Sequence, residues 1–143
     1  MQVRLSAHSA YRTEYHVVFV TKYRHQVLNP AQFTIVAEKA LKTTIEHIDE
    51  VELIELNVQP EHIHLVVIIP PKYAVSKVVE IIKSRSAKVI REEIPWLDKP
   101  YYGTPSMWTV GYFISTMGID ETIIKNYVKY QNKQDSVQAK LDL

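Results

Sequence analysis

The sequence predicts an α+β domain in which two helices pack on one face of a four-stranded antiparallel sheet. Val- and Ile-rich segments of strand length alternate with two longer segments that repeat apolar residues at helical spacing. Their order is β-α-β-β-α-β, the ferredoxin-like split βαβ arrangement, and one more helix follows it. Right-handed crossovers would place the first and third strands in the middle of the sheet.

Composition is typical of one soluble domain. The chain has 143 residues and no cysteine, which excludes disulfides and thiolate metal sites. Its apolar runs are far shorter than the ~20 residues that span a bilayer, so we expect no membrane segment and a cytoplasmic location. We expect a core at about residues 11–134 and a polar tail at 135–143. Lys and Arg number 17 and Asp and Glu 16, so any nucleic-acid surface must come from local basic clusters.

Four segments are predicted strands. Residues 11–23 carry apolar side chains on both faces, as in a central strand. Residues 51–58 alternate apolar and acidic side chains, and a tight turn leads from them into residues 62–69, which suggests a hairpin. Residues 108–115 supply the fourth strand.

Three helices are predicted, at residues 29–48, 75–94 and 121–134. Asn29 suits the N-cap of the first helix and Pro30 its first helical position. Asp120 is the expected N-cap of the last helix. A break is predicted just before it at Gly118, since glycine tolerates backbone angles that other residues avoid.

The second helix is locally basic. Lys83, Arg85, Lys88 and Arg91 project away from its apolar stripe and are candidate DNA contacts. A solvated helix surface explains the same charges, and this alternative stays open.

Two histidines stand out in the third predicted strand. Side chains alternate along a strand, so His62 and His64 share one face and Ile63 points to the other. Neutral imidazole is a common metal ligand, so the pair is a candidate metal site. The alternative is two half-exposed residues on a sheet face. In the predicted topology both histidines face away from the two packed helices, where the last helix can cover them.

The last helix carries a candidate nucleophile. Tyr127 and Gln131 are four residues apart and share a helix face. Tyr130 and Gln134 repeat this spacing, and a tyrosine at helical spacing is often a core residue, so spacing leaves the choice open. A tyrosine needs activation before it attacks.

Four segments together resemble the single-tyrosine HUH transposases of the 200/605 insertion-sequence family. They are YHVVFVTKYRHQVL near the start, EHIHLVV before a proline pair, WTVGYFISTMG and IIKNYVKYQ. The resemblance covers about residues 11–131 and implies that His62 and His64 bind a divalent metal, which Gln131 completes, and that Tyr127 is the nucleophile. Glu61, where the family commonly has Asp, is a mild departure that removes no ligand.

The resemblance also implies the reaction and the partners. The expected enzyme is a transposase that cleaves and rejoins single-stranded DNA at insertion-sequence ends through a 5′-phosphotyrosine intermediate. Mg or Mn is the expected cofactor, and mixed nitrogen and oxygen ligands suit Mn better. Hairpins at the element ends are the expected landmarks. The expected assembly is a homodimer in which the tyrosine helix of each subunit serves the histidines of its partner.

Three alternatives remain open at this point. A non-catalytic RNA- or DNA-binding module has the same element order and stacks bases on strand aromatics. A zinc hydrolase would use His62, His64 and a third ligand, either His16 or Glu61, although Glu61 is expected to face away from the histidines. A domesticated relative would act on host repeat hairpins by the same chemistry.

Overall fold

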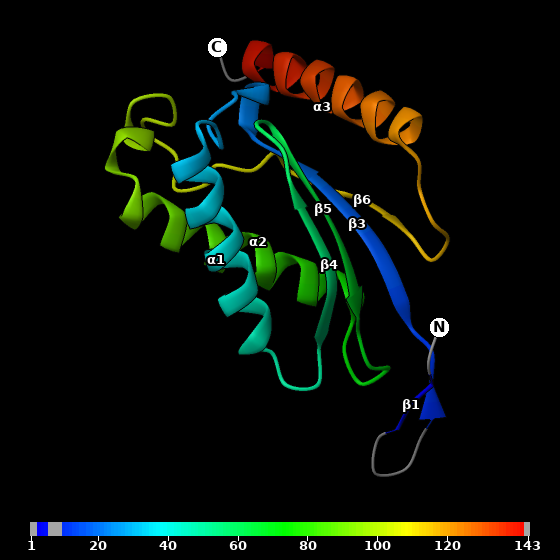
Figure 1. Ribbon diagram of the computed structural model, residues 1–143. Helices are drawn as coiled ribbons and strands as arrows, with labels where there is room; N and C mark the ends of the chain where they lie inside the picture. The colour runs from blue at the N-terminus through cyan, green and yellow to red at the C-terminus, as the bar shows by residue number, and fades with distance from the viewer. Residues whose placement is uncertain (1–2, 6–9, 142–143) are drawn as a thin grey trace.

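The main sheet has four antiparallel strands in the order β4-β5-β3-β6 (Figure 1). The computed structural model describes residues 3–5 and 10–141. The strands of this sheet are β3 (Glu14–Val20), β4 (Glu52–Val58), β5 (His62–Ile68) and β6 (Phe113–Ser115). A separate two-stranded sheet pairs β1 (Arg4–Leu5) with β2 (Ala10–Tyr11). As predicted, the strand that carries the histidines is central, paired with β3 on one side and β4 on the other.

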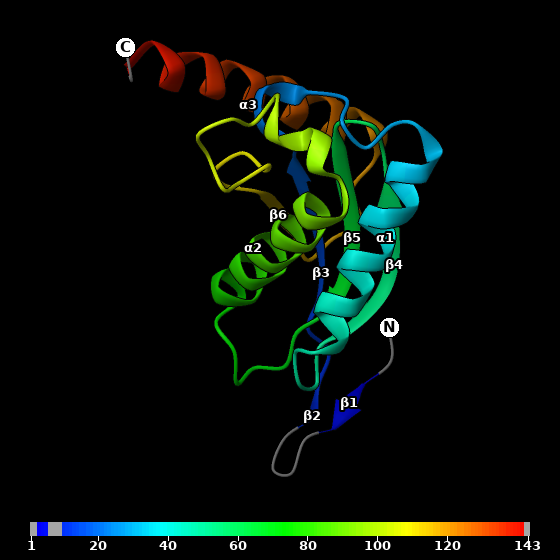
Figure 2. The same ribbon diagram turned by 90° about the vertical axis from the view of Figure 1, so that its left-hand side faces the viewer.

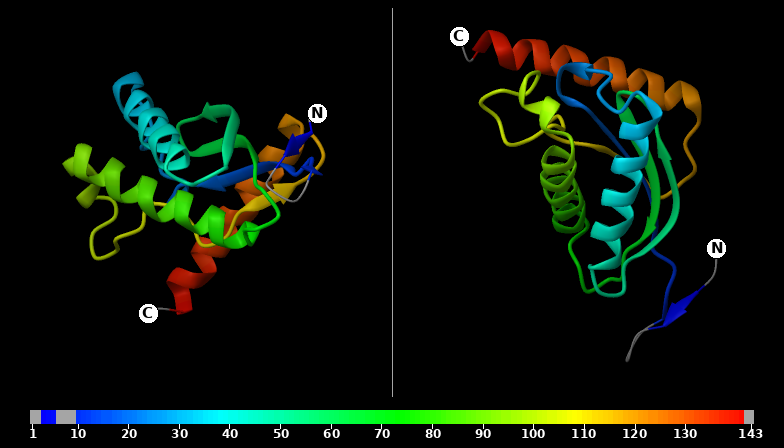
Figure 3. Two further views of the ribbon diagram at one scale, coloured as in Figure 1. Left: turned by 90° about the horizontal axis from the view of Figure 1, so that it is seen from below. Right: turned by 60° about the vertical axis from the view of Figure 1, so that its left-hand side comes forward.

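Helices lie on both faces of the sheet. α1 (Ala31–Glu46) and α2 (Val75–Glu93) cover one face, and α3 (Glu121–Leu141) crosses the other (Figures 2 and 3). Two short 3-10 turns, η1 (Lys22–Arg24) and η2 (Pro95–Asp98), connect these elements. The predicted fold class is confirmed: a ferredoxin-like βαββαβ core with an added C-terminal helix that carries the tyrosine. No helix within the described ranges is both long and apolar enough to cross a membrane.

The core lies between the sheet and the pair α1 and α2. On β5, Ile63, Leu65 and Val67 are fully buried in it, because every second side chain of a strand points to the same face. Each such side chain contributes about 1.5–3 kcal/mol through burial. The same alternation directs His62 and His64 to the opposite face, beneath α3.

The fourth strand is shorter than the predicted 108–115. Trp108 forms only an isolated bridge with Thr21, and regular pairing with β3 begins at Phe113. Between them Gly111 has a φ of +93°, which a strand does not allow. The backbone carbonyls of Thr109 and Gly111 are taken up by a lysine of α2 instead of a neighbouring strand.

Two helix ends differ from the predictions, and one predicted cap is confirmed. Pro30 itself occupies the N-cap of α1 in an extended conformation, and no side chain caps that helix, so the expected cap at Asn29 is wrong. Asp120 does cap α3, because its Oδ1 accepts a hydrogen bond from the Ile123 N–H at 2.9 Å. α3 continues to Leu141 and includes most of the expected tail, while residues 142–143 lie outside the described chain. The chain does break at Gly118, but this residue does not use the left-handed backbone angles that glycine permits.

Candidate active site

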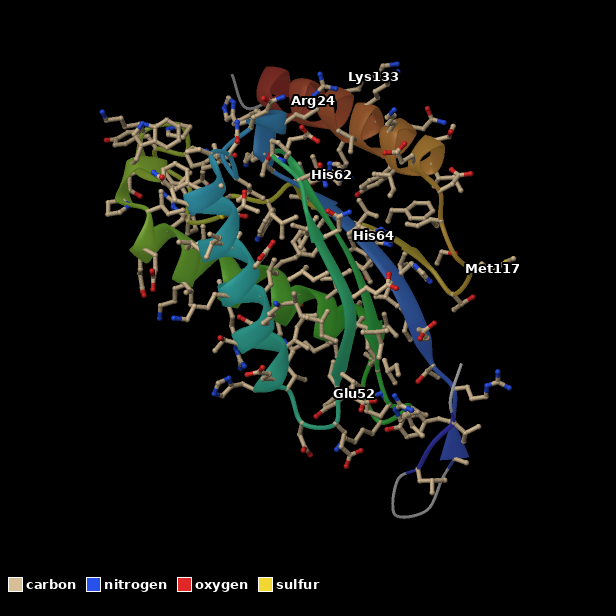
Figure 4. The ribbon with its side chains drawn as sticks, in the orientation of Figure 1. Arg24, Glu52, His62, His64, Met117 and Lys133 are labelled. Atoms are coloured by element: carbon tan, nitrogen blue, oxygen red, sulfur yellow. The ribbon has the colours of Figure 1, made fainter. Side chains whose placement is uncertain are left out.

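His62 and His64 lie in a groove between the sheet and α3 (Figure 4). Both side chains are half-buried, as their shared face on β5 predicts. The groove has a volume of about 480 Å³. Its walls come from η1, the β4–β5 hairpin and one face of α3: Arg24, Gln26, Asn57, Gln59, Glu61, Glu121, Ile124, Lys125, Val128 and Lys129.

Each histidine has a polar neighbour. Glu61 Oε1 lies 2.7 Å from His62 Nδ1, so the prediction that Glu61 faces away from the histidines is wrong. β5 begins only at His62, and Glu61 belongs to the preceding turn, where strand alternation does not apply. On the neighbouring strand, His16 Nδ1 lies 3.4 Å from His64 Nε2. A carboxylate on the distal nitrogen of a metal-binding imidazole orients the ring and raises its basicity.

Burial lowers the pKa of the His64 imidazole, and the nearby His16 and His62 lower it further, against a smaller opposite effect of Glu55. A lowered pKa keeps His64 neutral at neutral pH. Neutral imidazole is the form that binds a metal.

The two imidazoles of His62 and His64 fit part of the ligand set of a divalent metal ion. Two imidazoles on one face, one of them held by a carboxylate, suit a cation that accepts nitrogen ligands, such as Mn. Among the described residues, no three His, Cys, Asp or Glu side chains gather closely enough to hold a metal alone. The third ligand that the resemblance implies, Gln131, is of another type. The zinc hydrolase alternative, with His16 or Glu61 as third ligand, is not supported.

Tyr127 and Gln131 form a second pair, on α3. The Gln131 amide Nε2 donates a hydrogen bond to the Tyr127 hydroxyl at 2.5 Å. The Tyr127 ring packs against Phe113 of β6, with ring centroids 5.8 Å apart. Gln131 is 5% exposed and lies against Gly111, where an added Cβ would be 3.5 Å from its amide nitrogen. Neither residue lines the histidine groove. The structure thus brings His62 to His64 and Tyr127 to Gln131, with Tyr127 and Gln131 outside the lining of the histidine groove.

Of the four basic candidates of α2, Lys83 and Arg91 are partly buried and hydrogen-bonded within the chain, and Arg85 and Lys88 are exposed. The Lys83 ammonium donates hydrogen bonds of 2.7 Å to the carbonyls of both Thr109 and Gly111, and its burial lowers its pKa to about 8. The Arg91 guanidinium bonds the carbonyls of Thr104 and Tyr101 and the Asp98 carboxylate.

Arg85 and Lys88 remain exposed. They line a groove between α1 and α2, on the face of the sheet opposite the histidines.

Sequence reasoning missed three cations of the histidine groove: Arg24, Lys125 and Lys129. A signal for the two lysines was present, because they are four residues apart and therefore share a helix face. Arg24 had no such signal, since its place depends on the turn η1.

A family model described as "Transposase IS200 like" matches residues 9–131, which is most of the chain. The chain belongs to this family. Two relatives agree with the assignment. The transposase for insertion sequence element IS200 of Salmonella typhimurium is 29% identical over 140 residues, covering 96% of this chain and 88% of that protein. The ISDra2 transposase TnpA of Deinococcus radiodurans is 30% identical over 131 residues, covering 87% of this chain and 88% of that protein.

Solved structures show the same fold. A crystal structure of a protein assigned as a transposase, from Deinococcus radiodurans R1, superposes with a TM-score of 0.77 at 27% identity. It covers 90% of this chain and 97% of that one. A REP-associated tyrosine transposase bound to a REP hairpin superposes with a TM-score of 0.51 at 16% identity, covering 88% of this chain and 70% of that one, which shows a shared fold.

Membership of the IS200-like transposases confirms the resemblance to the 200/605 insertion-sequence family. It supports a DNA-processing enzyme of transposition over a non-catalytic binding module.

Proposed function

We propose that this IS200-like transposase cleaves and rejoins single-stranded DNA at insertion-sequence ends, with Tyr127 as the nucleophile. The observation that carries the proposal is the hydrogen bond from the Gln131 amide to the Tyr127 hydroxyl. A hydrogen bond donated to a phenol oxygen favours the ionised form, which is the form that attacks phosphorus. Tyr130, the competing tyrosine, is 54% exposed on α3.

The proposed reaction consists of two transesterification steps. In the first, Tyr127 Oη loses its proton and bonds to phosphorus, the bond from phosphorus to the 3′ oxygen breaks, and the 3′ oxygen takes up a proton and leaves as a 3′-hydroxyl. The product is a 5′-phosphotyrosine. In the second, the 3′-hydroxyl of another end attacks that phosphorus and releases Tyr127. Because the covalent link retains the bond energy, rejoining needs no nucleotide cofactor.

We further propose that His62, His64 and Gln131 hold a Mg or Mn ion. A bound cation there would polarise the scissile phosphate and spread its charge. Glu61 would orient the His62 ring, and burial would keep the His64 ring neutral.

The separation of the two residue pairs within one chain supports a shared active site. In this part of the proposal, His62 and His64 of one subunit work with Tyr127 of the partner subunit in a homodimer. We also propose that the protein recognises hairpins at the element ends. A protein of the same fold has been solved bound to a REP hairpin.

Replacing one oxygen atom tests the nucleophile. Tyr127→Phe should fold normally yet form no covalent protein–DNA adduct on a single-stranded element end. Tyr130→Phe is the matched control, because it removes the same atom from the same helix, and it should keep the adduct. The measurement is the shifted band on a denaturing gel. An adduct that persists in Tyr127→Phe, or disappears only in Tyr130→Phe, would show that another tyrosine attacks.

A further inference from the structure

We infer that Arg24 binds a backbone phosphate of the DNA strand in the histidine groove and is held for that role by the turn η1. The inference rests on the proposed function for the identity of the strand. Arg24 lines the groove with His62 and His64. Figure 4 shows Arg24 beneath α3, at the same end of the sheet as His62.

The backbone at Arg24 is held in an unfavourable conformation. Tyr23 has a φ of 60° and Arg24 a φ of 55°, so two consecutive non-glycine residues are left-handed. Such conformations persist only where the surroundings impose them, and they cluster at functional sites.

Four hydrogen bonds impose the turn. The Arg24 N–H donates to the Thr21 carbonyl at 2.9 Å, and the fully buried Thr21 hydroxyl donates to the His25 carbonyl at 2.7 Å. The Lys22 N–H donates to the Met107 carbonyl at 2.8 Å, and the Tyr101 hydroxyl donates to the Lys22 carbonyl at 3.2 Å. This network fixes where the Arg24 side chain leaves the backbone.

The same turn is joined to the strand of the histidines. The Thr21 N–H donates to the Glu61 carbonyl at 2.8 Å, and Val20, one residue earlier, pairs with His62. Glu61 in turn contacts the His62 ring. Arg24 therefore keeps its position relative to His62 whichever subunit supplies α3.

The charges of the groove favour an anion beside Arg24. Three cations, Arg24, Lys125 and Lys129, line it with two carboxylates, Glu61 and Glu121. The Glu61 carboxylate is occupied by His62. Among the residues whose side chains are described (3–5, 10–131 and 133), no ion pair joins Arg24 to a carboxylate. A guanidinium presents a planar fork that matches two phosphate oxygens. An exposed guanidinium on a rigid turn, beside two metal-ligand candidates, is suited to hold the phosphate backbone in register.

A binding experiment that needs no cleavage tests this inference. The protein is the full chain with Tyr127→Phe, and the probe is a fluorescent oligothymidine, followed by anisotropy over a range of salt concentrations. Adding Arg24→Gln should weaken binding roughly tenfold at low salt, the loss of one charged hydrogen-bonded contact. It should also reduce the slope of log affinity against log salt by about 0.7, the value for one phosphate of a single strand. Arg24→Lys should keep the slope and lose part of the affinity.

Arg12→Gln is the matched control, because it removes the same charge from an exposed position outside the groove. Arg24→Gly provides a second variant that adopts the left-handed turn without strain and should bind like Arg24→Gln. If Arg24→Gln and Arg24→Gly both keep the salt slope of Arg12→Gln, the inference is overturned. This outcome is independent of the chemistry: adduct formation by the unaltered chain tests Tyr127, and the salt slope tests Arg24.

Discussion

The ammonium group of Lys83 holds the segment between Trp108 and Phe113 against α2. It donates to two carbonyls of that segment and lies 5.9 Å from the centroid of the buried Phe19 ring. Gly111, whose carbonyl accepts one of these two hydrogen bonds, is also the residue against which Gln131 packs. The partly buried Lys83 ammonium thus contacts the same glycine as Gln131 of the tyrosine helix.

The lowered pKa of Lys83 predicts a specific dependence of stability on pH. Between about pH 8 and 10.5 the folded chain has released this proton and the unfolded chain has kept it. The unfolded state then binds more protons, so the free energy of unfolding rises with pH in this window. The rise should be on the order of 2 kcal/mol after allowance for solvent screening, and Lys83→Met should lack it.

Denaturant unfolding of the unaltered chain and of Lys83→Met from pH 7 to 11 gives the free energy of unfolding of each. The difference between the two removes the contributions of the other titrating lysines and tyrosines. A difference that does not change across this range would mean that Lys83 keeps its charge in the fold.

A second prediction at this scale concerns His64. Because burial lowers its pKa, its ring should titrate below pH 6.5 in the metal-free protein. Protonation then favours the unfolded state, so stability should fall as the pH drops below 6.5. His16→Gln removes a neighbouring positive charge and should move the midpoint upward. Histidine ring signals in an NMR titration give both midpoints. A His64 midpoint above 6.5, unmoved by His16→Gln, would contradict the assigned cause.

At the scale of elements, two helices present different faces to different surroundings. α3 directs Tyr127 and Gln131 toward Phe113 and Gly111, and it directs Lys125 and Lys129 toward the histidine groove. α2 turns Lys83 and Arg91 inward, and it leaves Arg85 and Lys88 on the outer surface beside α1.

The surface pair of α2 gives the prediction at this scale. Arg85 and Lys88 lie on the face opposite the histidines, so we expect them to contact a hairpin stem and not the strand that is cleaved. Arg85→Ala with Lys88→Ala should reduce the salt slope of binding to a hairpin oligonucleotide by up to about 1.8, at ~0.9 for each duplex phosphate. Binding to an unpaired oligothymidine is the control and should not change. An unchanged salt slope of hairpin binding would show that Arg85 and Lys88 are solvated surface residues that do not contact the DNA.

At the scale of the whole molecule, the pair α1 and α2, the sheet and α3 form three layers (Figure 3). His62 and His64 line the groove between the sheet and α3. His62 and His64 belong to the sheet, and Tyr127 belongs to a helix that joins the sheet through the segment around Gly118. The proposed exchange of α3 between two subunits requires that this helix dock on the partner's sheet with Tyr127 facing His62 and His64.

Mixing two inactive variants tests the exchange. His64→Ala and Tyr127→Phe should each be inactive alone. If sites form across chains, each mixed dimer has one intact site, and random pairing in two-fold dimers should restore about a quarter of the wild-type sites. Adduct formation after verified subunit exchange measures the recovery. Tyr127→Phe mixed with Gln131→Ala is the control and should stay inactive, because both changes lie on α3. A first mixture as inactive as its parents would show that Tyr127 works with the histidines of its own chain.

Local patterns were sufficient for the framework of this protein. Alternation along β3 and β5 and the apolar stripes of α1 and α2 predict the layers, because a side chain's direction within a strand or helix depends only on its spacing from its neighbours. The shared face of His62 and His64 and the shared face of Tyr127 and Gln131 follow for the same reason.

The contacts that individual side chains make were decided only by the tertiary structure. The positions of Lys83 and Arg91 along α2 are those of surface residues. Their cationic groups nevertheless donate hydrogen bonds to carbonyls of the segment that follows α2. Glu61 reaches His62 because a turn, and not a strand, carries it. Arg24 enters the histidine groove through a left-handed turn that Thr21 and Tyr101 impose from outside the segment. The contacts of Lys83, Arg91 and Tyr101 join separate segments of the chain, and those of Glu61 and Thr21 depend on turns, so residue periodicity predicts neither kind.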